Sequence, residues 1–203
     1  DCLLSRGLGD VYKRQNLELV INFYNERRKQ LLEVRPNDGH LGLAELEADF
    51  NVTVVTQNID NLHERAGSRR IIHLHGELTK VCSSRDPYNP HYIKELKPDE
   101  YEVKFGDKAG DGTQLRPFIV WFGEPVPEIE TAVNYVEKAD IFVIIGTSMN
   151  VYPAAGLLNY VPREAEVYLI DPKPVDVHSM RRIHVIQKGA SEGVRELRSL
   201  LQP

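Results

Sequence analysis

The stretch Ile141-Phe142-Val143-Ile144-Ile145-Gly146-Thr147-Ser148 decides the fold class of this 203-residue chain. Five consecutive apolar residues followed at once by glycine are typical of a strand that is buried on both faces and ends at a turn. Backbone N–H groups at such a strand end favour a phosphate or another anion, although a plain tight turn explains these residues equally well.

Similar strands and helices alternate along the rest of the chain. The further strands are expected at residues 52–56, 71–75, 118–121, 167–170 and 183–186. The helices are expected at residues 16–34, 41–49, 129–137 and 191–201, with a short one ending near Gly67. This order predicts an α/β fold with a Rossmann-like parallel sheet and helices on both faces. Residues 79–116 are rich in charge, proline and glycine, and they are expected to form a small irregular insertion.

Composition excludes several classes of protein. Lys plus Arg is 25 and Asp plus Glu is 30, which gives a formal net charge of -5, and 41% of the residues are hydrophobic. A mildly acidic chain of this kind has a real core and lacks the basic footprint of a nucleic-acid-binding protein. No apolar run is long enough to span a membrane, and two cysteines make no disulfide framework. We therefore expect a cytoplasmic protein without nucleic-acid or membrane partners.

Polar and glycine-rich segments follow five of the expected strands. In a parallel sheet the carboxyl ends of the strands share one edge, where ligands bind. The first segment also fits an Asx-type turn with a helix cap. The segments are residues 57–60, His75-Gly76, Gly123-Glu124, Gly146-Thr147-Ser148 and Asp171-Pro172-Lys173.

Three histidines lie close together in the sequence. His75 precedes a glycine at a strand end, a position that suits an exposed imidazole acting as a general base. His73 lies on the same face of the strand, and we interpret it as a structural histidine. With His63 the two also allow a metal-dependent hydrolase, although no set of carboxylate ligands lies nearby.

The first helix has an arginine in its apolar seam. Leu17, Val20, Tyr24, Arg27 and Leu31 repeat at steps of three and four residues, which places them on one face. Arg27 either extends its charged end to water or lies in an apolar pocket and receives a carboxylate. In the second case Tyr24 is placed to donate another hydrogen bond.

Together these motifs resemble the sirtuins, the NAD-dependent protein deacylases. The resemblance covers about residue 17 to the end, and its motifs occur in the order of the family. They are residues 56–63 (TQNIDNLH), 72–78 (IHLHGEL), 116–124 (RPFIVWFGE) and 146–148 (GTS).

The resemblance implies a cofactor, a base and a mechanism. His75 is then the catalytic base, which accepts a proton from a ribose hydroxyl after the acyl oxygen has attacked the anomeric carbon and expelled nicotinamide. The residues that resemble the NAD-binding positions of the family are Gln57, Asn58, Ile59, Asp60, Gly146, Thr147, Ser148, Asp171, Pro172, Lys173 and Ala190. At position 171 the family usually has asparagine.

The substrate implied by the resemblance is an acylated lysine side chain of a protein. Residues 23–28 (FYNERR) are similar to the helix of the sirtuin class that removes acidic acyl groups, in which Tyr24 and Arg27 match the carboxylate-binding pair and Arg28 faces solvent. We therefore expect deacetylase, desuccinylase and demalonylase activity. The residues that resemble the peptide-binding strand are Val120, Phe122, Gly123 and Glu124.

The chain differs from the family pattern in two places. The zinc module of the family has two cysteine pairs, whereas residues 79–116 contain Cys82 alone, so no zinc is expected. The glycine-rich phosphate loop of the family is not found, and residues 1–15 match nothing in it. We expect residues 1–15 to be non-native and residues 16–203 to be a catalytic domain that lacks its first strand and loop. The alternative is a catalytically impaired fragment that only binds acyl-lysine peptide.

Overall fold

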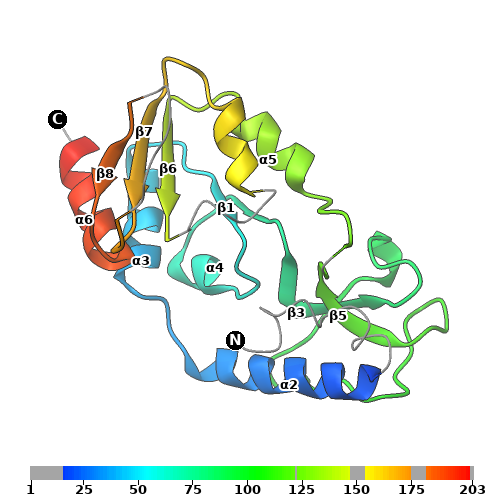
Figure 1. The fold of residues 1–203 in the computed structure, drawn as a ribbon. Helices are drawn as coiled ribbons and strands as arrows, with labels where there is room; N and C mark the ends of the chain where they lie inside the picture. The colour runs from blue at the N-terminus through cyan, green and yellow to red at the C-terminus, as the bar shows by residue number, and fades with distance from the viewer. Residues whose placement is uncertain (1–15, 122, 147–153, 175–181, 202–203) are drawn as a thin grey trace. The chain divides into compact units, whose positions relative to one another are not determined.

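Strand β6, Ile141–Ile145, forms at the apolar stretch and pairs in parallel with β7, Glu166–Ile170. Strand β7 pairs in parallel with β8, His184–Ile186, on its other side. The exposed fraction of the Val167 and Leu169 side chains is 0%, and that of Ile170 on the opposite face is 1%. Helices therefore cover both faces of this sheet, as the sequence predicts: Figure 1 shows α6 and α3 on one side and α5 with η3 on the other.

The computed structural model describes residues 16–121, 123–146, 154–174 and 182–201. The chain forms two compact units. Unit 1 includes the chain as far as Val34, Thr56–Asn61 and His73–Pro127. Unit 2 includes Arg35–Val55, Leu62–Ile72 and the chain from Glu128 onward. The sheet of β6, β7 and β8 belongs to unit 2.

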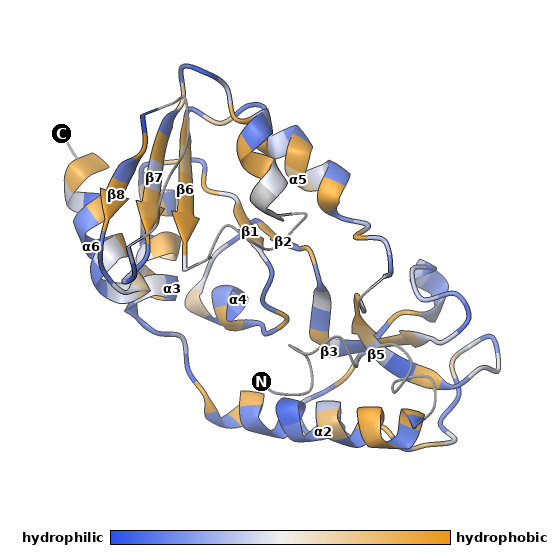
Figure 2. Ribbon diagram, in the orientation of Figure 1, coloured by the Kyte–Doolittle hydropathy of each residue, from blue (hydrophilic) through white to orange (hydrophobic). Residues whose placement is uncertain are grey.

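Among its described residues, unit 2 contains six helical elements. They are α3 (Asp38–Glu45), η1 (Leu46–Ala48), α4 (Leu62–Ala66), α5 (Ile129–Val136), η3 (Ala154–Tyr160) and α6 (Ala190–Leu201). The side chains of α6 pack on one face of the sheet, which is largely hydrophobic along β6 and β7 (Figure 2). This core cluster contains Leu46, Tyr168, Ile170, Ile186, Val194 and Leu197.

Helix α3 begins three residues earlier than the sequence analysis expects. Asn37, in the expected turn, is its N-cap: Asn37 Oδ1 accepts hydrogen bonds from Gly39 N at 2.9 Å and His40 N at 3.2 Å. Asparagine is common both in turns and at helix N-caps, which explains why the sequence predicts a turn where the helix begins.

Unit 1 contains an antiparallel sheet in the order β4-β3-β5. Strand β3 is Gly76–Ser83, β4 is Lys94–Glu95 and β5 is Leu115–Ile119. The expectation of an irregular insertion over residues 79–116 is therefore wrong at both ends, which belong to β3 and β5. Between these strands the chain is largely irregular and contains only the short η2 (Pro90–Tyr92) and β4 among the described elements. Strand β3 was missed because it carries charged residues that pair locally: Lys80 Nζ lies 2.7 Å from Glu77 Oε1.

Helix α2, Leu17–Glu33, completes unit 1. It shows alternating hydrophobic and hydrophilic bands in Figure 2, and its buried residues are Ile21, Tyr24, Arg28 and Leu31. Two short strands, β1 (Val54–Thr56) and β2 (Ile71–His73), form a separate two-stranded sheet. The boundary between the two units falls inside each of these strands, after Val55 in β1 and after Ile72 in β2.

Gly76 opens strand β3 instead of ending the preceding strand. Its φ is +83°, and a Cβ atom at this position would lie 2.1 Å from Phe118 O on β5. Any other residue would clash with the β5 backbone, so the close crossing of the two strands requires glycine. This crossing directly follows His75.

A cluster of oxygen atoms joins the two ends of the insertion. Ser83 Oγ donates to Asp111 Oδ2 at 2.7 Å and lies 3.0 Å from Thr113 Oγ1. Thr113 Oγ1 also donates to Asp111 Oδ1 at 2.7 Å. Hydrogen bonds from Ser83 and then Thr113 lower the pKa of Asp111 to about 2. The cluster therefore holds the ends of β3 and β5 together with a charged carboxylate at neutral pH.

Candidate active site

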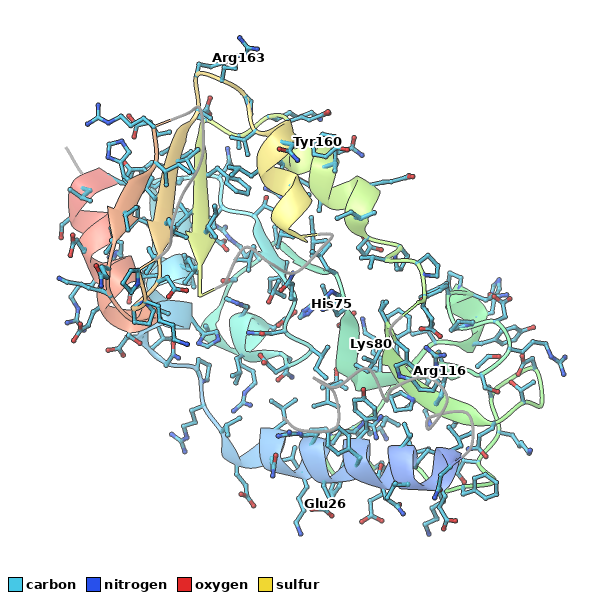
Figure 3. All side chains as sticks on the ribbon, viewed as in Figure 1. Glu26, His75, Lys80, Arg116, Tyr160 and Arg163 are labelled. Carbon is cyan, nitrogen blue, oxygen red and sulfur yellow. The ribbon has the colours of Figure 1, made fainter. Side chains whose placement is uncertain are left out.

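His75 lies in the turn between β2 and β3, in unit 1 (Figure 3). Its side chain is half-buried, and burial lowers its pKa below 6.5, while a hydrogen bond with the backbone of Gln57 raises the pKa and offsets part of this shift. Its carbonyl oxygen accepts from Val120 N at 3.0 Å. The imidazole is therefore neutral at pH 7 and able to accept a proton.

The loop of residues 57–60 is fixed beside His75 by backbone hydrogen bonds. Leu78 N donates to Ile59 O at 2.7 Å, and Asn58 N donates to Thr56 Oγ1 at 3.0 Å. His73 Nδ1 lies 3.1 Å from Asn58 O, which confirms its structural role. The structure thus brings the expected base together with the expected nicotinamide and ribose segment, including the half-buried Asp60.

Two amide groups in this loop fit a polar ligand. Gln57 Nε2, a donor, and Asn61 Oδ1, an acceptor, are both buried and have no hydrogen-bond partner among the described residues. Buried polar atoms are nearly always paired, so an unpaired donor and an unpaired acceptor in one loop indicate a place for a group with the same needs. A carboxamide or a sugar hydroxyl meets them, and both occur in NAD.

The inner face of α2 differs from the seam that the sequence predicts. Tyr24 is buried, as expected, with 2% of its surface exposed, but the buried arginine is Arg28, also at 2%. The expectation that Arg28 faces solvent is therefore wrong. Arg27 is half-exposed, with Cζ 5.2 Å from the Phe23 ring centroid and Nη1 3.2 Å from Gln30 Oε1.

Arg28 connects α2 to the strand that follows His75. Its Nε donates to Leu78 O at 2.8 Å, and its Nη1 donates to Asn25 Oδ1 at 2.9 Å. Asn25 in turn exchanges two hydrogen bonds with the backbone of Val103, at 2.8 and 3.0 Å. Burial lowers the pKa of Arg28 to about 10, so it remains charged at neutral pH. Arg28 thus helps to hold Tyr24 and Arg27 in place.

Tyr24 lies beside the segment that resembles the peptide-binding strand. Burial raises the pKa of its hydroxyl, while Arg116, a hydrogen bond with Trp121 and Arg28 lower it and offset part of this shift. The glycine of that segment, Gly123, has a φ of +85°. Phe122 lies outside the described residues.

The side chain of Glu124 is used within unit 1. Its two carboxylate oxygens accept from Arg116 Nη1 at 2.7 Å and Arg116 Nη2 at 2.9 Å. The second oxygen also accepts from Trp121 N at 2.9 Å. The carboxylate of Glu124 is therefore held by donors from unit 1, among them Arg116 and Trp121.

The expected adenosine and phosphate positions lie in unit 2. Gly146 follows β6 with a φ of +60°, and its N–H donates to Ile170 O at 2.9 Å. Asp171 follows β7 directly, and its Oδ1 accepts from Lys173 N at 2.8 Å across Pro172. Both segments thus lie at the carboxyl ends of neighbouring parallel strands. Ala190 is the first residue of α6, and Thr147 and Ser148 lie outside the described residues.

The histidines do not form a metal site. The His63 ring is tilted against the His40 ring with centroids 4.7 Å apart, whereas the His73 ring contacts the backbone of Asn58. Across residues 16–121, 123–146, 154–174 and 182–201, no group of three or more His, Cys, Asp or Glu side chains is placed to hold a metal ion. The metal-dependent hydrolase therefore has no support. In the same parts of the chain no helix is long and apolar enough to cross a membrane.

Sequence reasoning missed Asn61, Arg28, Arg116 and Trp121 as parts of the site. Each lies within or directly beside a motif that carries the resemblance. Each has a buried side-chain nitrogen or oxygen, and helical periodicity alone does not reveal this property.

Comparison with known proteins gives consistent results. A family model described as "Sir2 family" matches residues 10–153. The chain is 84% identical over 185 residues to an NAD-dependent protein deacylase from Bacteroides thetaiotaomicron, covering 91% of this chain and 79% of that protein.

Solved structures agree with this match. A crystal structure of a Sir2 homologue in complex with NAD has a TM-score of 0.78 and 33% identity, covering 94% of this chain and 75% of that chain. A Sir2–p53 peptide–NAD+ structure has a TM-score of 0.76 and 26% identity, covering 97% and 83%. With the parallel sheet, the neutral His75 and the loop of residues 57–60, these matches show that the chain belongs to the Sir2 family.

Proposed function

We propose that this chain is an NAD-dependent protein deacylase that removes succinyl and malonyl groups, as well as acetyl groups, from lysine side chains. Its deacylase activity is supported by the 84% identity to a protein of that name. The preference for acidic acyl groups depends on Tyr24 and Arg27, and the binding roles of the individual residues are likewise part of the proposal.

The state of Arg27 supports a carboxylate-binding role. Within the described residues Arg27 contacts the Phe23 ring and the neutral Gln30 amide, and it has no carboxylate partner. Tyr24 lies three residues earlier on the same helix; burial raises the pKa of its hydroxyl, and the charge of Arg27 is one of the influences that offset part of this shift. An arginine without an acidic partner next to a buried tyrosine hydroxyl fits the free carboxylate of a succinyl or malonyl group.

The residues of unit 1 fit the chemistry of deacylation. NAD supplies the sugar carbon that accepts the acyl group and the nicotinamide that leaves. His75 accepts a proton at a ring nitrogen, which its lowered pKa keeps free at pH 7. The unpaired amides of Gln57 and Asn61 are placed to orient the carboxamide or ribose of the cofactor.

The first experiment measures nicotinamide release from NAD with acetyl-lysine and succinyl-lysine peptides. Turnover that falls by about a hundred- to ten-thousandfold in His75→Ala supports the base role. The matched control is His91→Ala, in an exposed position of η2. Undiminished turnover in His75→Ala would show that another group takes the proton.

The second experiment tests the acyl preference with Arg27→Met. We expect kcat/KM for the succinyl peptide to fall by about ten- to a hundredfold, because one charge-assisted hydrogen-bonded pair is lost, while acetyl turnover changes little. Arg35→Met, at an exposed position beyond α2, controls for the loss of a positive charge. Equal losses on both peptides would contradict the carboxylate-binding role.

A further inference from the structure

Arg116, which lies on β5, is a buried charge of unit 1 that both guanidinium Nη atoms help to pair (Figure 3). It is 4% exposed and forms a two-point ion pair with Glu124, whose side chain is 23% exposed. Its Nη2 also donates to Ile119 O at 2.9 Å. A buried ion pair is weak support for overall stability, because desolvation of the charges offsets their attraction. The pair therefore calls for a role beyond stability.

The ion pair between Arg116 and Glu124 also determines the path of the chain that connects these two residues. Glu124 binds the Trp121 N–H with its carboxylate, and its own N–H donates to Trp121 O at 3.0 Å. The Arg116 guanidinium lies 3.9 Å from the Trp121 ring centroid, in a stacking position. Arg116 thus contacts Ile119 just before the segment, Trp121 within it and Glu124 at its end.

This segment also contacts the base. Val120 N donates to the carbonyl oxygen of His75 at 3.0 Å, so the segment is held directly beside the turn that carries the imidazole. A peptide bound along residues 120–124 therefore has its position relative to His75 set by the conformation of the segment.

We infer that Arg116 and Glu124 are positioning residues that hold Val120, Trp121, Gly123 and Glu124 in the shape that binds the backbone of the substrate peptide. Glu124 accordingly acts through Arg116 and Trp121 instead of touching substrate with its carboxylate. The inference rests on one part of the proposed function, namely that the segment after β5 binds the substrate peptide. It is independent of the identity of the acyl group.

The test compares Glu124→Gln with the unchanged chain on two substrates, an acetyl-lysine peptide and a single acetyl-lysine capped at both ends. The capped residue has no flanking backbone to pair with the segment. We expect KM for the peptide to rise by about ten- to a hundredfold, because one charged hydrogen bond of the pair is lost. We expect kcat, KM for NAD and KM for the capped residue to stay within about threefold.

Two further variants make the result decisive. Arg116→Lys keeps the positive charge but loses the planar guanidinium that binds both carboxylate oxygens. We expect it to raise KM for the peptide as Glu124→Gln does, without raising KM for the capped residue. The double variant is expected to be no worse than the more affected single variant, because the two residues act as one unit. Glu196→Gln is the matched control, since Glu196 forms an ion pair with Lys188 on the surface of unit 2.

Several outcomes would overturn the inference. An equal loss on the peptide and on the capped residue would mean that the pair serves the reaction or the fold in general. A folded Glu124→Gln variant with unchanged peptide KM would exclude any positioning role, and failure of both single variants to fold would assign the pair to the fold alone. A chain that releases no nicotinamide with any acyl peptide would contradict the proposed function instead, and peptide binding measured by fluorescence anisotropy would then test the pair separately.

Discussion

Arg28 shows how one buried cation supports the site at the scale of a single residue. Replacing it with methionine keeps much of the buried stem but removes the Arg28 hydrogen bond to Leu78 O and leaves Asn25 Oδ1 with Val103 N alone. We expect Arg28→Met to lower the free energy of unfolding by about 2 to 4 kcal/mol, measured by urea denaturation. Lys29→Met, on the exposed side of the same helix, is the control and should change stability little. Equal stability of the two variants would mean that Arg28 is not an anchor.

The pKa of His75 predicts the acid limb of the pH profile. Burial lowers this pKa, so the neutral base persists below the ordinary value of 6.5 and is lost only when the pH falls through the lower value in the folded protein. We expect the midpoint of the acid limb of kcat/KM for the acetyl peptide to lie below pH 6.5. A midpoint above 6.5 would show that the imidazole is stabilised in its charged form.

The error at positions 27 and 28 explains what a sequence can reveal about a single side chain. Tyr24 was predicted correctly because a buried tyrosine with apolar neighbours fits a helical repeat. Arg27 and Arg28 differ by only one helical step, and both three-residue and four-residue spacings from Tyr24 lie on the same side of a helix. The choice between them depends on Leu78 O and Asn25 Oδ1, which only the tertiary structure brings into reach.

At the scale of elements, the close crossing of β3 and β5 depends on Gly76. Gly76→Ala adds a Cβ atom 2.1 Å from Phe118 O in addition to the cost of a positive φ. We expect this variant to lose cooperative unfolding or to melt far below the unchanged chain in a thermal scan. Gly112→Ala is a matched control, because its φ of +78° is similar and nothing lies within 4 Å of an added Cβ. It should cost only about 1 to 2 kcal/mol, and similar losses in both would disprove the clash.

The elements that were predicted well are those whose signal is local. The apolar stretch at residues 141–145 forms β6 with the expected bounds, because a continuous apolar run needs no partner to be recognised. Strand β3 was not predicted because its signal is not local: its register with β5 shifts between Gly76 and Val81, and its charged residues interrupt the alternation. The placement of the loop of residues 57–60 beside His75 likewise follows from local signals, whereas the Arg116–Glu124 ion pair does not.

At the scale of the whole molecule, each unit is built from segments that are distant in the sequence. In unit 2, helix α3 packs against α6, with Gly42 so close to Val194 that an added Cβ atom would lie 2.7 Å from Val194 Cγ1. Ion pairs join the same two helices: Arg195 with Asp38 at 3.3 Å, and Arg198 with Glu45. The sheet of unit 2 therefore depends on a helix that precedes it by about a hundred residues.

A fragment that begins at Glu128 tests this dependence. It keeps β6, β7, β8 and α6 but loses α3, so we expect exposed apolar surface and no cooperative unfolding by circular dichroism. Addition of residues 35–72 as a separate chain is expected to restore cooperativity. A fragment that unfolds cooperatively by itself would show that the sheet and α6 are sufficient.

The cluster of Ser83, Asp111 and Thr113 has a consequence for chemical damage. Its atoms are hydroxyl and carboxylate oxygens, which do not undergo the oxidation steps that convert thiolates to sulfenic and sulfinic acids. Cys82, the one cysteine of the described residues, is buried with its pKa raised to about 11, so very little of it is thiolate at neutral pH. Peroxide concentrations that unfold a module held by metal-bound thiolates would therefore leave this insertion, and the segment after β5 that we propose binds the peptide, intact.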